Sequence, residues 1–182
     1  MSNIQKQSRR VRLFLQLLFF VIPAGVVYFW LTAQTEFDLL TKAGVIQLSF
    51  NIDSLTQLNL SYTTRLLAAF ASLLVASIVL YALSILIRLF RNYENGNIFT
   101  QENARYYQKL GYCLFYWVAG GVIYGGAISV ILSFNNPPGE RILSLGFAGI
   151  DFLTIVLGFL VLIISWVMKE AYQIADENSQ TI

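Results

Sequence analysis

Few side chains in this sequence could carry out chemistry. The chain has no histidine and a single cysteine, Cys113. This composition excludes imidazole-based acid–base catalysis, Ser/His/Asp and Cys/His nucleophile systems, the usual zinc sites and an intramolecular disulfide. The sequence also contains no HExxH motif, no Walker-type glycine loop and no convergent pair of carboxylates. We therefore expect no enzymatic activity, no metal and no other cofactor.

The elements that carry the remaining polar residues are those of a membrane protein. Of the 182 residues, 57% are hydrophobic and 12% are charged, whereas roughly 25% are charged in a typical globular domain. Apolar runs long enough to cross a bilayer are predicted at 13–33, 66–87, 110–134 and 148–168. Because an unpaired peptide group in hydrocarbon is costly, these runs must be helical. We predict an all-α membrane protein, a single domain with an antiparallel bundle of four transmembrane helices.

The distribution of lysine and arginine predicts the orientation of the chain. Nine of the twelve basic residues fall in the N-terminal arm, in segment 88–109 or in the tail 169–182, and three fall elsewhere. Because cytoplasmic loops retain basic residues, both termini are expected in the cytoplasm. The first span exceeds the apolar core of about 7–15 residues in a secretory signal, so we expect it to be a permanent anchor.

The extracytoplasmic segment 34–65 alternates apolar and polar residues over 45–53 and again over 58–63. This period of two predicts a small β-hairpin between the first two spans. Its apolar face could cover the ends of the helices, or it could contact a ligand or a partner. Two charges lie within or beside the spans on this side, Arg65 and Asp151, and a structural ion pair between them is one hypothesis for their role.

The cytoplasmic connection 88–109 carries signals for the end of one helix and the start of the next. Asn95-Gly96 can adopt the positive φ that terminates a helix, and Thr100 can accept a hydrogen bond from the Asn103 amide to begin another. The second and third spans are therefore predicted to continue beyond the membrane as a helical hairpin.

Small residues indicate where helices can approach closely. Gly121 and Gly125 form a GxxxG pair in the third span, and Ala68, Ser72 and Ala76 recur every fourth residue in the second. Two interpretations stay open, packing within one bundle and a homo-oligomer formed through the glycine face. Bulky replacements at either glycine are expected to damage folding or assembly.

Residues 96–103 (GNIFTQEN), Gly111 and the terminal run 177–182 (ENSQTI) resemble the bacterial four-span family catalogued as domain of unknown function 2975. The resemblance implies a bacterial cell (inner) membrane protein, often encoded beside a small helix-turn-helix regulator of the Cro/CI type. It supplies no catalytic residues. Members of that family typically end in an acidic residue followed by Leu-Thr-Ile, whereas Ser179 and Gln180 precede Thr181 here.

The cytoplasmic face is the strongest candidate for activity. Basic side chains there could attract anionic lipids or a cytosolic partner, and an acidic tail follows the fourth span; the candidate contact residues are Arg88, Arg91, Arg105, Lys109, Glu177, Thr181 and Ile182. The expected function is that of a non-enzymatic interaction or regulatory module with a cytosolic partner. A small transporter or a membrane-protecting immunity factor is the alternative. A net charge of +2 argues against direct binding of nucleic acid.

Overall fold

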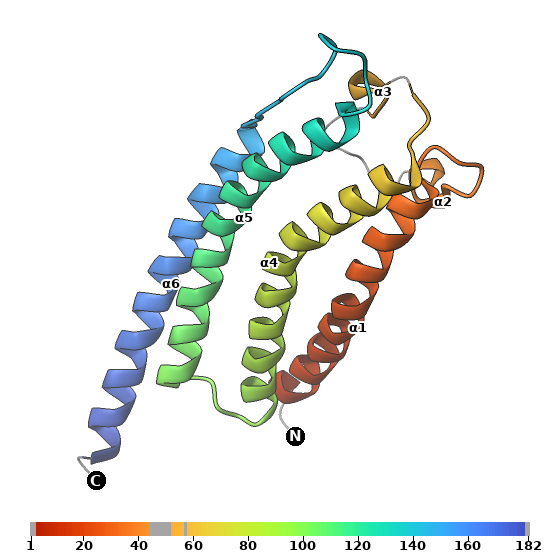
Figure 1. The fold of residues 1–182 in the computed structure, drawn as a ribbon. Coiled ribbons are helices and arrows are strands. Elements are labelled where there is room, and N and C mark those ends of the chain that lie inside the picture. The colour runs from red at the N-terminus through yellow and green to blue at the C-terminus, as the bar shows by residue number, and fades with distance from the viewer. Residues whose placement is uncertain (1–2, 44–51, 57, 181–182) are drawn as a thin grey trace. The chain divides into compact units, whose positions relative to one another are not determined.

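The computed structural model describes residues 3–43, 52–56 and 58–180. Its helices, in chain order, are α1 (Asn3–Thr32), α2 (Leu39–Lys42), α3 (Ile52–Leu55), α4 (Tyr62–Glu94), α5 (Gln101–Ser133) and α6 (Gly149–Gln180) (Figure 1). The described residues contain no strand. The prediction of an all-α fold is confirmed.

Four of these helices, α1, α4, α5 and α6, are long and apolar enough to cross a membrane. They correspond one to one with the four predicted spans, and they support a multi-pass membrane protein. Each has 30 to 33 residues, or about 45–50 Å at 1.5 Å per residue, against about 30 Å of hydrocarbon. The ends of the helices therefore have to lie in the headgroup region or in water.

The chain divides into two compact units. Unit 1 comprises Met1–Phe20, Ile78–Val118 and Ala148–Ile182, and unit 2 comprises Val21–Ser77 and Ala119–Phe147. Unit 1 thus holds the start of α1, the end of α4, the start of α5 and all of α6. Unit 2 holds the end of α1, the start of α4, the end of α5 and both short helices.

The core of unit 2 joins three long helices and the segment that links α1 to α4. Its buried members are Phe29, Trp30, Ala33, Leu55, Leu60, Ala68, Ala69, Ile128 and Leu132. A polar contact lies beside them: Trp30 Nε1 donates to Ser72 Oγ at 2.7 Å, and that hydroxyl is 2.8 Å from the Tyr124 hydroxyl. Side chains of α1, α4 and α5 are therefore linked by hydrogen bonds as well as by apolar packing.

In unit 1, the α4–α5 pair buries Ile85, Leu89, Tyr106 and Cys113. The α5–α6 pair approaches closely at two glycines. A methyl group at Gly111 would lie 2.7 Å from Leu162 Cδ2, and one at Gly158 would lie 3.0 Å from the Phe115 ring. These two positions admit no larger side chain without a shift of the neighbouring groups.

The predicted β-hairpin is wrong in the part that can be tested. Most of its first strand, 45–51, lies outside the described residues, but Ile52 and Asp53 belong to α3 and residues 58–61 form no strand. Hydroxyl groups satisfy the backbone locally instead. Thr56 Oγ1 accepts from the Leu58 amide, and Ser61 Oγ accepts from the Thr64 amide at the start of α4.

Apolar residues of this linking segment nevertheless cover helix ends in unit 2, which is one of the two roles proposed for the segment from the sequence. Leu55 and Leu60 are 7% and 8% exposed and pack into the core of unit 2. Their burial does not need strand pairing, because a helical turn and an irregular segment place both side chains against the helices.

Candidate functional site

The α4–α5 connection begins with a well-defined helix end. The Asn97 amide donates to the Asn92 carbonyl at 2.9 Å and the Gly96 amide to the Tyr93 carbonyl at 3.1 Å, the paired bonds of a Schellman motif. Gly96 has φ +83°, a conformation that glycine adopts without strain. The prediction that Asn95-Gly96 terminates the helix is confirmed.

The next helix starts as the sequence indicates. The Asn103 amide donates to Thr100 Oγ1 at 3.2 Å, so Thr100 is the N-cap of α5. The predicted helical hairpin over 88–109 is therefore present, with the last seven residues of α4, a short connection and the first turns of α5.

The side chain of Asn103 fixes the connection from within. It is fully buried, and its Nδ2 donates to the carbonyls of Asn97 and Ile98 at 2.7 and 2.8 Å. Its Oδ1 accepts from Asn92 Nδ2 at 2.8 Å. The capping pattern of the sequence predicts a role only for the backbone amide of Asn103. The signal for the role of its side chain is the density of asparagine in this connection.

Two acidic side chains at the connection accept hydrogen bonds from neighbouring side chains. Glu102 accepts from the Tyr106 hydroxyl at 2.6 Å and from Asn92 at 3.0 Å. These two hydrogen bonds hold the pKa of the Glu102 carboxyl below its ordinary value. Glu94 accepts from Arg12 Nε at 2.8 Å, which ties the start of α1 to the end of α4.

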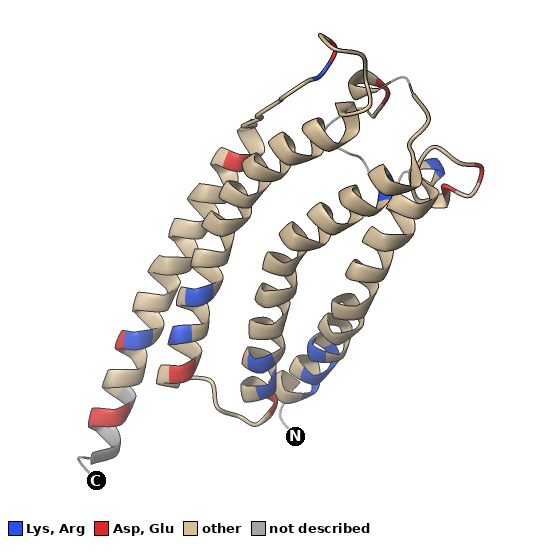
Figure 2. Cartoon of the chain, viewed as in Figure 1, with Lys and Arg blue, Asp and Glu red and all other residues tan. Residues whose placement is uncertain are grey.

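Several basic side chains of the same region are exposed to solvent. Figure 2 shows lysine and arginine at the start of α1, the end of α4 and the start of α5. We define the hairpin surface by four exposed basic side chains and one exposed aromatic side chain of this region: Arg88, Arg91, Arg105, Lys109 and Phe99. Phe99 is 56% exposed at the turn that Asn103 holds. The hairpin surface thus combines four positive charges with one apolar group on a fixed backbone.

The acidic tail is a continuation of α6. The helix extends to Gln180, twelve residues beyond the predicted end of the span at 168, and Glu177 is exposed on it. The other two tail residues named as candidates, Thr181 and Ile182, lie outside the described residues.

Arg65 closes the end of a helix. Its Nη1 donates to the carbonyls of Ala33 at 2.6 Å and Leu31 at 3.2 Å, where α1 ends, and its Nε donates to Leu60 at 3.2 Å. The last carbonyls of a helix have no partner within the helix, and they carry the negative end of its dipole. A guanidinium satisfies both needs, because it is positive and presents several donors.

Asp151 plays a corresponding role at the start of α6, where unpaired amides rather than carbonyls need partners. Its Oδ2 accepts from the Ala148 amide at 2.7 Å, the back-bond that an acidic residue makes at the third position of a helix. Arg65 and Asp151 thus each have a partner of their own, in unit 2 and unit 1 respectively. An ion pair between them stays a prediction.

The small residues named from the sequence have different surroundings. Ala68 and Ala76 are buried on α4, and Ser72 bonds to Trp30 and Tyr124. On α5, a methyl group at Gly125 would touch Ser144 O at 3.7 Å, whereas one at Gly121 would meet nothing within 4 Å. An oligomer formed through the glycine face stays a prediction, and within one chain the close glycines are Gly111, Gly126 and Gly158.

Replacing Asn103 with aspartate tests the fixed connection. The carboxylate would face the carbonyls of Asn97 and Ile98 without a proton to donate, so we expect Asn103→Asp to lose about 2–3 kcal/mol of stability at pH 7. Acidification should restore part of this loss, because the protonated acid can donate one hydrogen bond. Amide hydrogen exchange over 95–101, together with unfolding in mixed micelles at several pH values, measures both effects.

The matched control is Asn97→Asp, which introduces the same charge on an exposed side chain of the same connection. It should alter neither exchange nor stability. Equal behaviour of the two variants would show that the Asn103 side chain does not hold the turn.

Replacing Arg65 tests its role at the end of α1. We expect Arg65→Ala to cost about 2 kcal/mol, the range for hydrogen bonds to a charged group, and Arg65→Lys to recover only part of it, since one ammonium cannot span the same carbonyls. Lys42→Ala, which removes an exposed lysine bonded to the Glu36 carbonyl, should cost less than about 0.5 kcal/mol. Unfolding by SDS in mixed micelles provides the comparison, and an Arg65→Ala variant as stable as Lys42→Ala would contradict the assignment.

Comparison with known proteins places the chain in a family. No curated protein and no solved structure matches it. Residues 53–182, well over half of the chain, match the family described as "Protein of unknown function (DUF2975)". The matched part includes α4, α5 and α6, the fixed connection around Asn103 and the hairpin surface. The chain therefore belongs to the DUF2975 family.

Proposed function

We propose that this chain is a non-enzymatic protein of the bacterial cell membrane, with both termini in the cytoplasm, that binds a cytosolic regulatory protein through the hairpin surface. By the family resemblance noted above, a small helix-turn-helix regulator is the first partner to test. The main observation in support of this proposal is that Phe99 and four basic side chains are exposed around a connection that the buried Asn103 holds in place.

The charge distribution supports this orientation. Nine of the twelve lysines and arginines belong to unit 1, which also contains both ends of the chain, and three belong to unit 2. Positively charged loops are retained in the cytoplasm during insertion. The hairpin surface, on this orientation, faces the cytosol.

The character of the hairpin surface supports a protein partner. Aromatic and arginine side chains contribute most to binding at protein interfaces. A connection that is already ordered loses less conformational entropy on binding than a flexible one. Anionic lipids would attract the same charges at about 1 kcal/mol per basic residue, but lipid attraction does not require an ordered turn.

The surroundings of the two charges beside the spans favour a structural over a transport role. Transport sites recruit several polar groups or broken helices near the middle of the membrane. Arg65 and Asp151 instead bond to backbone groups at helix ends. Their hydrogen bonds account for both residues without a conduction path.

Affinity capture of the tagged chain from native membranes, followed by identification of the co-purified proteins, tests this function. We expect a cytosolic protein, recovered about tenfold less with the double variant Arg91→Glu/Arg105→Glu and less with Phe99→Ala, because a complementary partner would meet repulsion or lose its apolar anchor. Lys42→Glu, a charge reversal in unit 2, is the matched control and should leave recovery unchanged.

Deletion of 175–182 distinguishes binding by the hairpin surface from binding by the acidic tail at the end of α6. If the hairpin surface alone binds the partner, the truncated chain recovers as much of it as the parent. Equal recovery from parent and double variant would contradict the proposal, as would recovery of no cytosolic protein.

A further inference from the structure

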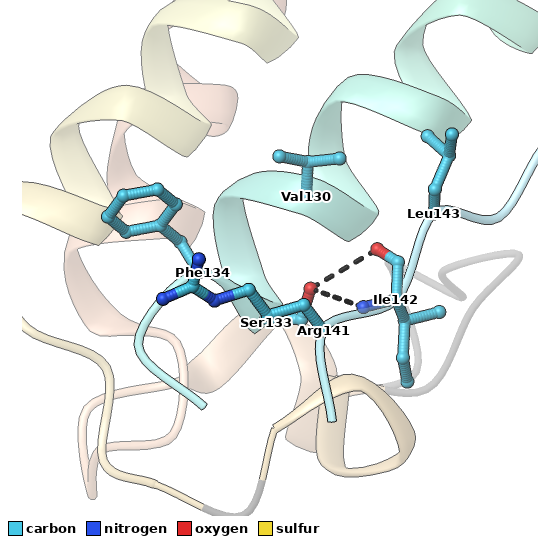
Figure 3. A pocket seen from close by; sticks show the side chains of 6 residues that line it. All are labelled: Val130, Ser133, Phe134, Arg141, Ile142 and Leu143. Carbon is cyan, nitrogen blue, oxygen red and sulfur yellow. Dashed lines mark hydrogen bonds between the residues drawn. The ribbon is translucent and has the colours of Figure 1, made fainter. Parts of the chain in front are cut away.

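A shallow pocket lies where α5 ends, in unit 2. It has a volume of about 130 Å³ and is lined by Val130, Ser133, Phe134, Arg141, Ile142 and Leu143. Figure 3 shows that the last turn of α5 forms one wall and that the chain returning through Ile142 and Leu143 forms the other. Pockets for compact small molecules are larger, at about 300–1,000 Å³, so this pocket suits a narrow group such as part of an acyl chain.

Two buried serines hold the returning chain in place. Ser133 Oγ accepts from the Ile142 amide at 2.9 Å, and Ser129 Oγ accepts from the Ser144 amide at 2.9 Å. Both side chains are 1% exposed. They supply partners to peptide groups of an extended segment, as backbone near hydrocarbon requires. Both walls of the pocket are therefore part of the ordered structure.

The lining of the pocket is apolar with one positive charge. Val130, Phe134 and Leu143 are 43%, 61% and 69% exposed. The Arg141 guanidinium lies over the Phe134 ring, 5.2 Å from its centre, at a distance suited to a cation–π contact. Arg141 is exposed, and the described residues give it no carboxylate partner within ion-pair distance.

The position of the pocket matches the boundary between hydrocarbon and headgroups. The third apolar run of the sequence ends at 134, and α5 ends at Ser133. General attraction of anions does not explain this site, because unit 2 carries four acidic and three basic residues. One of the acidic residues, Glu140, directly precedes Arg141, so attraction of an anionic group to the pocket depends on Arg141 itself, and the apolar walls can hold only the apolar part of a ligand.

We propose that this pocket binds one anionic phospholipid of the surrounding membrane. The phosphate would lie at the Arg141 guanidinium, and part of one acyl chain would lie against Val130, Phe134 and Leu143. The charge at the rim and the apolar walls complement the two parts of such a lipid. This inference depends on the chain lying in a membrane, and it does not depend on a cytosolic partner.

Native mass spectrometry of the delipidated full-length chain in a neutral detergent tests the proposal. The probes are phosphatidylglycerol, phosphatidylcholine with the same acyl chains, and inorganic phosphate. The parent should retain one phosphatidylglycerol more tightly than phosphatidylcholine, and phosphate alone should not displace it. Arg141→Gln should weaken phosphatidylglycerol binding about tenfold, the range for loss of a charge-assisted hydrogen bond.

Three variants sharpen the result. Arg141→Lys should retain part of the preference, Lys42→Gln should retain all of it as the matched basic residue of unit 2, and Leu143→Ser should weaken binding of both lipids. Arg141 and Leu143 are exposed, so these variants should fold, and circular dichroism verifies this. Equal binding of the two lipids by the parent, full displacement by phosphate, or an Arg141→Gln variant that binds like the parent would each overturn the proposal.

Discussion

The need to pair every peptide group in the absence of water governs this structure. Hydrocarbon offers no hydrogen bonds, so the apolar runs form long helices, and the unpaired groups concentrate at the helix ends. The few polar residues of the chain are used there. Arg65 bonds to the carbonyls at the end of α1, Ser61 and Thr100 accept from amides at the starts of α4 and α5, and Asp151 does so at the start of α6.

The same constraint explains why contacts between the helices are sparse and specific. Only 11–22% of the most apolar window of each long helix is buried within the chain, so most of that surface is left for lipid. Helix association in a bilayer has no hydrophobic driving force and depends on close packing and hydrogen bonds. Close packing occurs here where α5 and α6 approach at Gly111 and Gly158. Hydrogen bonding occurs where the side chains of Trp30, Ser72 and Tyr124 join α1, α4 and α5.

Features governed by local chemistry could be predicted from the sequence. The spans follow from uninterrupted apolar length, and the helix ends at Gly96 and Thr100 follow from backbone preference and capping. Alternation over 58–63 was misleading, because the hydroxyls of Thr56 and Ser61 pair with nearby amides and make strand pairing unnecessary. The partners of Arg65, Asn103 and Ser133 could not be predicted, since they depend on which backbone groups the fold brings within reach. Glycine spacing likewise does not reveal that Gly111 is crowded while Gly121 has open space beside it.

Accessibility of single cysteines on the two ends of α5 tests the central claim most directly. In a Cys113→Ala background, Gln101→Cys lies at the start of α5 and Glu140→Cys lies beyond its end. If α5 crosses the bilayer in the proposed orientation, a membrane-impermeant maleimide labels Glu140→Cys in intact cells and labels Gln101→Cys only after permeabilisation. Labelling of both positions in intact cells, or of Gln101→Cys alone, would contradict the account.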